Sequence, residues 1–326
     1  MKRTDPVNDL IVEEAAAATE PELYIPFHLK PSRLLAVGDP KQLPATVLSR
    51  ATRLGLSKSL HERLMFDCNY PHVMLDIQYR MNCEISNFPS RCFYDSQIGN
   101  GSNVSDARYL EGPVLLDKLP YMFYQIAGTE EQGAAGSFYN RSEALAIVDL
   151  VCQLRQQGNS TGSTTPWHSA DRLRIISFYN AQVLLIKRML QEKGLGNKVL
   201  VATVDSSQGC EADIVLISFV RSPSDRSSNG RGPSAGFLTD DRRMNVALTR
   251  ARFQLVCVGN VRAFHKLARA ATLHRLAADA ETRGVIHQTT TFAHADEEVN
   301  DRLNAFYGPP PPQGETESNK RLKTSR

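Results

Sequence analysis

Short runs of apolar and β-branched residues alternate with helix-compatible segments along this chain, and that alternation strongly limits its fold. The runs expected to be strands are 10–12, 33–37, 73–77, 173–179, 199–204, 213–220 and 254–258. Segments with helical spacing lie between or beside them, at about 21–29, 180–193, 241–252 and 262–281. Strands that alternate with helices form βαβ units, so the pattern predicts an α/β fold with mostly parallel sheets.

Asp241–Arg252 is the helical segment with the most unusual charge pattern. Its apolar residues have the i, i+3, i+4, i+7 spacing of a helix face that packs on a sheet, namely Met244, Ala247, Leu248 and Ala251. On such a helix Arg243 and Arg250 are two turns apart and share a second face. Two guanidinium groups on a buried helix are costly unless an anion meets them. The alternative is a solvated surface helix held by salt bridges.

Composition excludes several classes of protein. The 326 residues are 41% hydrophobic, which suffices for two cores of ordinary domain size, and no apolar run approaches a membrane span. The six cysteines include no Cys-x-x-Cys pair, which argues against a zinc site or disulfide framework and for a reducing compartment. The net charge of +3 permits an anionic partner without predicting one.

Polar motifs follow the ends of the expected strands, where open α/β sheets bind their ligands. In chain order they are Glu13-Glu14, Gly38–Val47, Gln78–Met81, Gln208–Glu211 and the segment that ends with Arg250. Their order and spacing, over roughly residues 9–265, resemble the superfamily 1 helicases, specifically the senataxin-like group. The resemblance implies RecA-like domains of the P-loop NTPase architecture, with ATP and Mg²⁺ as cofactors and RNA or DNA as the partner.

By this resemblance, an acidic pair and two arginines perform phosphoryl-transfer chemistry. Glu13 takes the metal position and Glu14 the position of the general base. Gln42 resembles the residue that senses the γ-phosphate and positions water, with turn capping as the alternative. Arg80 and Arg250 resemble the two arginines that clamp the γ-phosphate. In related NTPases such arginines are worth ~10³–10⁵ in rate.

The resemblance also implies contacts to the nucleoside and to nucleic acid. Tyr79 matches an aromatic that stacks on the base, with core packing as the alternative. Glu211 matches a carboxylate that accepts from the ribose, with a surface-loop role as the alternative, and Gly209 permits close backbone approach. The expected contacts to the nucleic-acid backbone lie at strand ends, where capping is the alternative, at Tyr179, Asn180 and Thr203.

Three features depart from the family pattern. No Gly-x-x-x-x-Gly-Lys-Ser/Thr phosphate loop occurs in the 326 residues, and we expect the strand that would hold it upstream of Met1. The family's Asp-Glu pair is Glu13-Glu14 here, and Ala17 replaces a glutamine. Asn82-Cys83 replaces a His-Pro pair, a milder change. We therefore expect this chain alone to hydrolyse little or no ATP.

The predicted organisation has three parts. These are a remnant of a first RecA-like domain over residues 1–70, a complete second RecA-like domain over 71–280, and a mostly disordered tail over 281–326. Polar stretches at 156–166 and 222–234 are expected to be exposed loops. The expected function is that of an ATP-dependent superfamily 1 helicase in truncated form. The alternative is a non-hydrolysing module that binds nucleic acid or a protein partner.

The expected location is nuclear or cytoplasmic, with the nucleus slightly favoured and no membrane association. The basic residues 320–323 resemble an import signal, although a solvated tail explains them better. The motifs do not distinguish RNA from DNA, because the nucleic-acid contacts that they imply avoid the bases.

Overall fold

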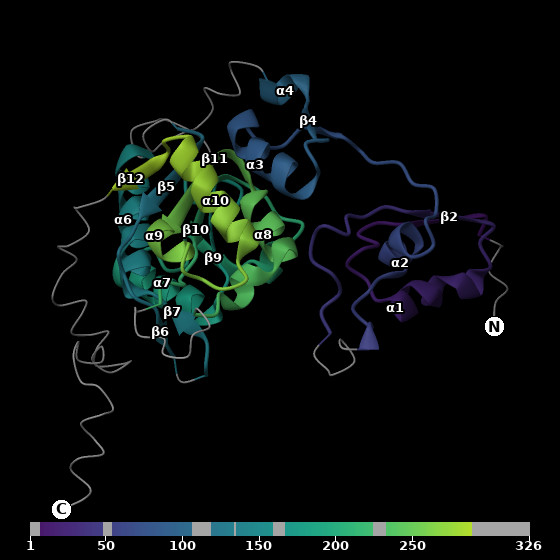
Figure 1. Cartoon of the computed structure of the whole chain (residues 1–326), viewed down its shortest axis with the longest axis horizontal. Coiled ribbons are helices and arrows are strands. Elements are labelled where there is room, and N and C mark those ends of the chain that lie inside the picture. The colour runs from purple at the N-terminus through teal and green to yellow at the C-terminus, as the bar shows by residue number, and fades with distance from the viewer. Residues whose placement is uncertain are drawn as a thin grey trace, which may run out of the picture.

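The structure, a computed structural model, describes residues 7–47, 54–105, 119–133, 135–158, 167–223 and 233–288. Most of the two expected loops, and the expected tail from residue 289 onward, lie outside these residues. Figure 1 shows a large α/β unit and, beside it, a small unit formed by the N-terminal residues. Segments without regular structure, at 38–47 and 67–76, run between the two units.

A six-stranded parallel sheet forms the centre of the large unit. The strand order is β12-β5-β11-β10-β8-β9, and every neighbouring pair is parallel. The strands are β5 (Tyr121–Gln125), β8 (Leu173–Ser177), β9 (Leu200–Thr203), β10 (Ala212–Ser218), β11 (Ala251–Gly259) and β12 (Ile286–Gln288). β8 and β10 are buried along their whole length, as parallel strands covered on both faces are. The predicted α/β fold with a parallel sheet is confirmed.

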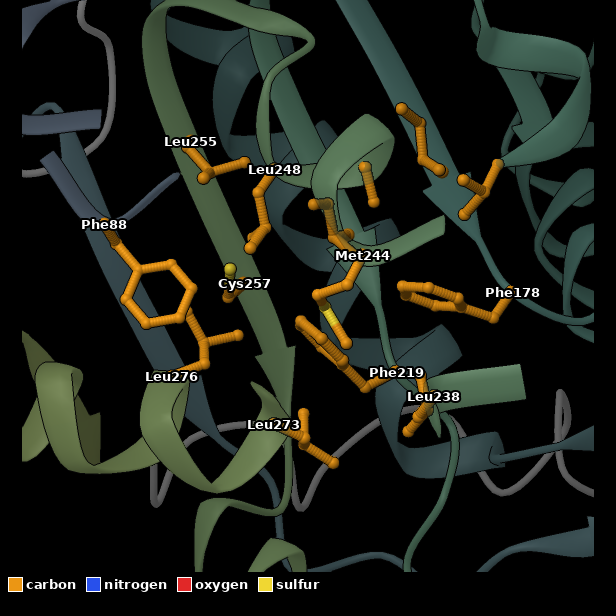
Figure 2. Close-up of a cluster of buried hydrophobic side chains, with 14 of the residues drawn as sticks. Phe88, Phe178, Phe219, Leu238, Met244, Leu248, Leu255, Cys257, Leu273 and Leu276 are labelled. Atoms are coloured by element: carbon orange, nitrogen blue, oxygen red, sulfur yellow. The ribbon is translucent and has the colours of Figure 1, made fainter. Parts of the chain in front are cut away.

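Helices cover both faces of this sheet. One face packs against α6 (Arg141–Gly158) and α7 (Asn180–Glu192). The other packs against α3 (Cys83–Phe93), α8 (Asp241–Leu248), α9 (Val261–Phe264) and α10 (Ala271–Thr282). Figure 2 shows this second core, where Leu255 and Cys257 of β11 lie among residues of α8 and α10 such as Leu248 and Leu276. The large unit therefore has three layers, helices–sheet–helices.

The N-terminal unit contains a two-stranded parallel sheet. Its elements are β1 (Asp9–Val12), α1 (Glu20–Tyr24), the 3-10 helix η1 (Ile25–Leu29), β2 (Arg33–Ala36) and α2 (Leu60–Phe66). Gly38 follows β2, and a Cβ at this position would lie 2.7 Å from the backbone nitrogen of Ala16. The chain after β2 therefore passes very close to the chain after β1, which places the Glu13-Glu14 pair beside the Gly38 loop.

Shorter elements complete the fold. They are β3 (Ile77–Gln78), β4 (Gly99–Asn100), α4 (Ser102–Ser105), β6 (Glu131–Gln132), β7 (Phe138–Tyr139), η3 (Asp205–Ser207) and η4 (Gly236–Thr239). β3 and β4 pair outside the main sheet, and β6 and β7 form a small antiparallel ribbon.

The arginine segment differs from its prediction as one helix over 241–252. α8 ends at Leu248, Thr249 is the C-cap, and β11 begins at Ala251. Arg243 and Arg250 therefore do not share a helix face, because Arg250 lies in the turn between helix and strand. The ladder between β10 and β11 already includes Ala251, and this pairing ends the helix.

Two further predicted elements also differ. Of the run 73–77 only Ile77 is in a strand, and Val73 and Leu75 are largely exposed instead of lying in a sheet. The helix predicted over about 262–281 is divided into α9 and α10. Between them Ala268 forms a β-bridge with Ser234, which a continuous helix would not allow.

The sequence pattern also missed β5, α6 and β12. β12 lies beyond residue 280, where the second domain was predicted to end, and pairs with β5 in the main sheet. The predicted domain boundaries themselves stay predictions.

Candidate functional site

Four loops from distant parts of the sequence meet where the N-terminal unit contacts the large unit. The loop after β2 forms hydrogen bonds with the large unit. Among them, Asn245 of α8 donates to the carbonyl oxygen of Lys41 (2.9 Å), and Gln208 Nε2 donates to that of Leu43 (3.5 Å). The second loop is 208–211, which contains Gln208. The third is 78–81, which precedes α3, and the fourth is 249–250, which precedes β11. The structure thus brings together the motifs that the sequence distributes over more than two hundred residues.

Arg80 joins two of these loops. Its Nε donates to Glu211 Oε2 at 2.5 Å, and its Nη1 donates to the carbonyl oxygen of Thr249 at 3.3 Å. Glu211 also accepts from Arg252 Nη1 (3.3 Å). Burial by itself raises the pKa of Glu211, but the hydrogen bond and charge of Arg80, together with Arg252, bring it below its usual value. Glu211 is therefore held ionised by two arginines.

Arg250 is the largest fully buried side chain in the described part of the chain and is only 2% exposed. Its guanidinium donates to three uncharged oxygens: the carbonyls of Val246 (3.0 Å) and Cys210 (3.2 Å), and Thr249 Oγ1 (2.8 Å). No carboxylate of the described residues forms an ion pair with it. Burial, and next the charge of Arg80, lower the pKa of Arg250 to about 10. A buried cation beside a second cation is costly when no anion neutralises it, so this position should bind an anion strongly.

The acidic pair lies near this arginine. Glu13 and Glu14 are both exposed, and Glu14 adopts φ +53°, a left-handed conformation in the turn that follows β1. The charge of Glu14 acts to raise the pKa of Arg250, so the two groups lie within electrostatic range of each other. Glu14 and the arginine thus border the same region.

Gln42 is positioned by its own loop. Its backbone N–H donates to the carbonyl of Asp39 (3.1 Å), and its side-chain Nε2 donates to Asp39 Oδ2 (2.9 Å). The side-chain bond, to a residue three positions earlier in the same loop, is of the kind that the turn-capping alternative implies. The side-chain bond leaves the amide oxygen Oε1 as the part of the group that can accept from water or position it.

Comparison with known proteins identifies the family. Residues 56–262 match a family described as an AAA domain, and residues 1–50 match a second family with the same description. The chain belongs to the AAA domain family. The first match covers most of the large unit, including Arg80, Glu211 and Arg250, and the second covers β1, β2 and the Gly38 loop.

Several curated relatives of this AAA domain chain are named as helicases. This chain is 37% identical over 263 residues to the regulator of nonsense transcripts 1 homolog of Drosophila melanogaster. The matched region covers 79% of this chain and 21% of that protein. The chain is 36% identical to the ATP-dependent helicase upf1 of Schizosaccharomyces pombe (79% and 27%) and 35% identical to the helicase sen1 of the same species (77% and 14%). The chain therefore spans 14–27% of the length of these relatives. The expected superfamily 1 helicase family, with its senataxin-like group, is confirmed.

The remaining nucleotide-site predictions concern an aromatic and a glycine. Tyr79, next to Arg80, is 62% exposed, so core packing does not explain it. Gly209 adopts φ +71°, which favours glycine, and it lies one residue before the carbonyl of Cys210 that accepts from Arg250. Tyr79 thus lies next to Arg80, and Gly209 lies close to Arg250. Their contacts with a nucleoside stay predictions.

The three residues predicted to contact nucleic acid differ in their exposure to solvent. Asn180 is exposed at the start of α7, and Thr203 at the end of β9 is half-buried, with its hydroxyl bonded to Ser206 (2.9 Å). Tyr179 is buried, and its hydroxyl donates to the carbonyl of Ala235 (3.3 Å). The Tyr179 side chain therefore supports the neighbouring loop at Ala235. The contact of Tyr179 with nucleic acid, like those of Asn180 and Thr203, stays a prediction.

Metal binding by this AAA domain chain would depend on few protein ligands. Within the described ranges, no three His, Cys, Asp or Glu side chains are grouped as a metal site. Mg²⁺ at nucleotide sites is held by one or two carboxylates plus phosphate oxygens, so the exposed Glu13-Glu14 pair fits this mode and needs no third ligand. Among the described helices, none is long and apolar enough to cross a membrane.

Sequence reasoning missed three residues of this region. Tyr94 at the end of α3, Asn245 in α8 and Asp39 in the Gly38 loop form hydrogen bonds that join the two units. Asp39 and Asn245 lie inside motifs that were recognised, but their partners are distant in sequence. Tyr94 lies outside every recognised motif, and nothing in its local pattern indicates the contact.

Proposed function

We propose that this chain is part of an ATP-dependent superfamily 1 helicase that acts on RNA or DNA, and that Arg80 and Arg250 bind the terminal phosphate of ATP. The observation that supports this most is the buried Arg250 guanidinium, whose hydrogen bonds all go to uncharged oxygens. The names of its relatives, which include ATP-dependent helicases, support nucleotide use.

The residues divide the chemistry among them. Arg80 and Arg250 neutralise the charge that spreads over the transferred phosphate oxygens. Glu14 accepts the proton of the attacking water, and Gln42 orients that water through its amide oxygen. Glu13 holds Mg²⁺, which when bound screens the phosphate charge. The printed 326 residues include no phosphate loop, so we assign no residues to the α- and β-phosphates.

One comparison of variants tests the arginine assignment. The change Arg250→Met removes the charge and keeps much of the side-chain volume. Because a hydrogen bond to a charged group is worth about 1.5–3 kcal/mol, we expect binding of a fluorescent ATP analogue with Mg²⁺, followed by anisotropy, to weaken by roughly 10- to 150-fold. Arg243→Ala is the matched control. Arg243 lies in α8, seven residues before Arg250, but it is already neutralised by Asp205 and Asp240, so its loss should leave affinity within about threefold.

Equal affinity in Arg250→Met and in the unchanged chain would contradict the phosphate role of Arg250. No measurable binding of the analogue by the unchanged chain would favour the second function, a module that binds nucleic acid or a protein partner without nucleotide. The Glu13 side chain, one methylene longer than the family's aspartate, and Ala17 favour this second function. A nuclear or cytoplasmic location remains part of the proposal.

A further inference from the structure

A chain of hydrogen bonds links the Gly38 loop to α8 through a side chain from a third segment. Tyr94 Oη donates to Asp39 Oδ2 at 2.6 Å and accepts from Asn245 Nδ2 at 2.7 Å. Asn245 Nδ2 also donates to the carbonyl of Lys41 at 2.9 Å. We call Asp39, Lys41, Tyr94 and Asn245 the Tyr94 bridge.

The chemistry of the groups fixes the direction of each bond. The Lys41 carbonyl can only accept, so the amide nitrogen of Asn245 must face it. The same nitrogen then donates to Tyr94 Oη, whose own proton is left for the Asp39 carboxylate. Asn245 is fully buried in α8, and burial together with the charge of Asp39 raises the pKa of the Tyr94 phenol well above its usual value. Tyr94 therefore stays protonated and keeps donating.

The Tyr94 bridge also determines how Gln42 is presented. Asp39 Oδ2 accepts from Tyr94 and from Gln42 Nε2 (2.9 Å), so one carboxylate oxygen holds both groups. With its nitrogen committed to Asp39, the Gln42 amide cannot flip without losing this bond. At the other end of the bridge, Asn245 is one helical turn from Thr249, whose hydroxyl donates back to the Asn245 carbonyl (2.8 Å) and accepts from Arg250.

We propose that Tyr94 and Asn245 are positioning residues that hold the Gln42 amide in a fixed orientation relative to Arg250. Neither residue touches the reacting atoms. They connect the Gln42 loop of the N-terminal unit to the turn that holds Arg250 in the large unit. The distance between the group that positions water and the group that binds phosphate is thereby kept constant. The role of this spacing in ATP chemistry rests on the proposed function, whereas the coupling of the two loops does not.

Hydrogen exchange followed by mass spectrometry on the whole chain tests the coupling. The change Tyr94→Phe removes only the hydroxyl, and we expect amide exchange in the peptide spanning residues 39–47 to rise about tenfold, because a hydrogen bond to a charged group is lost. Tyr139→Phe is the matched control, since it removes a phenol that donates to a different carboxylate, Glu131 (3.0 Å). It should leave the 39–47 peptide unchanged.

A second variant keeps the test decisive. Asn245→Leu removes both donors at similar volume and should raise exchange in the same peptide. The double variant should raise it by less than the product of the two single effects, since the two residues share one bond. If Tyr94→Phe changes only the α3 peptide and leaves 39–47 within twofold, Tyr94 merely packs its own helix and the proposal is wrong. If Tyr94→Phe does not fold, unchanged 39–47 exchange in Asn245→Leu overturns it in the same way.

The nucleotide part has a separate readout. With Mg²⁺ and ATPγS added, the 39–47 peptide should be protected in the unchanged chain and at least threefold less protected in Tyr94→Phe. Absence of protection in both proteins would contradict the proposed function, while the ligand-free rates would still decide the coupling. Equal protection in both would overturn the positioning role.

Discussion

Glu143 allows a quantitative test of how this fold treats a buried charge. Its carboxyl group, near the start of α6, has no exposure to solvent. One oxygen accepts from Ser218 Oγ (2.7 Å) and from the backbone N–H of Val220 (2.8 Å), and the other has no hydrogen-bond partner among the described residues. Burial raises the pKa of Glu143 to about 7, although hydrogen bonds from the Ser218 hydroxyl and from the backbone act to lower it.

The sign and size of the effect follow from linkage. A glutamate pKa raised from 4.5 to about 7 means that the folded chain binds this proton more tightly than the unfolded chain does. Its contribution to stability is therefore complete below about pH 4.5 and is lost as the pH rises towards 7. At 1.36 kcal/mol per unit, the full loss is about 3 kcal/mol.

The perturbation is Glu143→Gln, which keeps the shape and an oxygen for Ser218 and Val220 but cannot ionise. We expect the free energy of unfolding of the variant, relative to the unchanged chain, to rise by about 3 kcal/mol between pH 4.5 and 8. Urea denaturation followed by circular dichroism at several pH values measures this difference. An offset that is the same at every pH reflects the unpaired amide nitrogen and does not affect the slope.

Glu192→Gln is the control, because Glu192 lies on α7 in an i, i+4 pair with Arg188 at 3.5 Å and is not enclosed in the core. It should show a pH dependence within about 0.5 kcal/mol of the unchanged chain. If the curve for Glu143→Gln is also parallel to that of the unchanged chain from pH 4.5 to 8, Glu143 is ionised throughout. The account of its burial would then be wrong.

Two further predictions concern the N-terminal unit and the reaction. Gly38→Ala places a Cβ against the backbone nitrogens of Ala15 (3.0 Å) and Ala16 (2.7 Å), so we expect a loss of about 1–3 kcal/mol and faster hydrogen exchange in β1 and β2, with the main sheet unaffected. The chain as printed should hydrolyse ATP negligibly, because its sequence contains no phosphate loop. A phosphate-release rate that is stimulated by single-stranded nucleic acid and abolished by Arg250→Ala would contradict this.

The fold was predictable where the spacing of apolar residues is typical of either a helix or a strand alone. The alternation of strands and helices indicated a parallel sheet, and the segment from Leu173 to Glu192 folds as β8 and α7, as expected. β5 was missed because its five residues, Tyr-Met-Phe-Tyr-Gln, include none of the Val, Ile and Leu residues that marked β8 and β10 as strands. The end of α8 was misplaced because Ala251 satisfies the helical spacing and is also the first residue of a strand. Only the pairing of β11 with β10 decides between the two.

The site was predictable as a set of residues but not as a set of contacts. Motif order brought Arg80, Glu211 and Arg250 into one proposal, and the structure places them around Thr249 and Cys210. The pairing of Arg80 with Glu211 could not be foreseen, since the two are separated by 131 positions in the chain and neither motif specifies the other. The burial of the Tyr179 side chain at the predicted strand end could not be foreseen from its motif either.

Arg221 and Arg250 show why burial alone does not identify a ligand-binding arginine. They are 5% and 2% exposed. At Arg221, burial lowers the pKa, but Glu130, whose oxygen lies 2.8 Å from Nε, and Tyr179 outweigh it, so the pKa is raised. At Arg250 the pKa falls. A buried pair that loses one partner leaves the other charge unpaired, so Arg221→Met should cost about 3–5 kcal/mol of unfolding free energy.

Arg250→Met leaves no carboxylate unpaired among the described residues, and the cost of burying its charge disappears with it. The relief offsets the lost hydrogen bonds to Val246, Cys210 and Thr249, so the unfolding free energy should change by less than about 2 kcal/mol. Urea denaturation of both variants at pH 7 makes the comparison. Equal losses would mean that Arg250 is a structural arginine like Arg221. Unequal losses, with nucleotide binding impaired in Arg250→Met, would mean that the fold retains this buried charge at the expense of stability because an anionic ligand requires it.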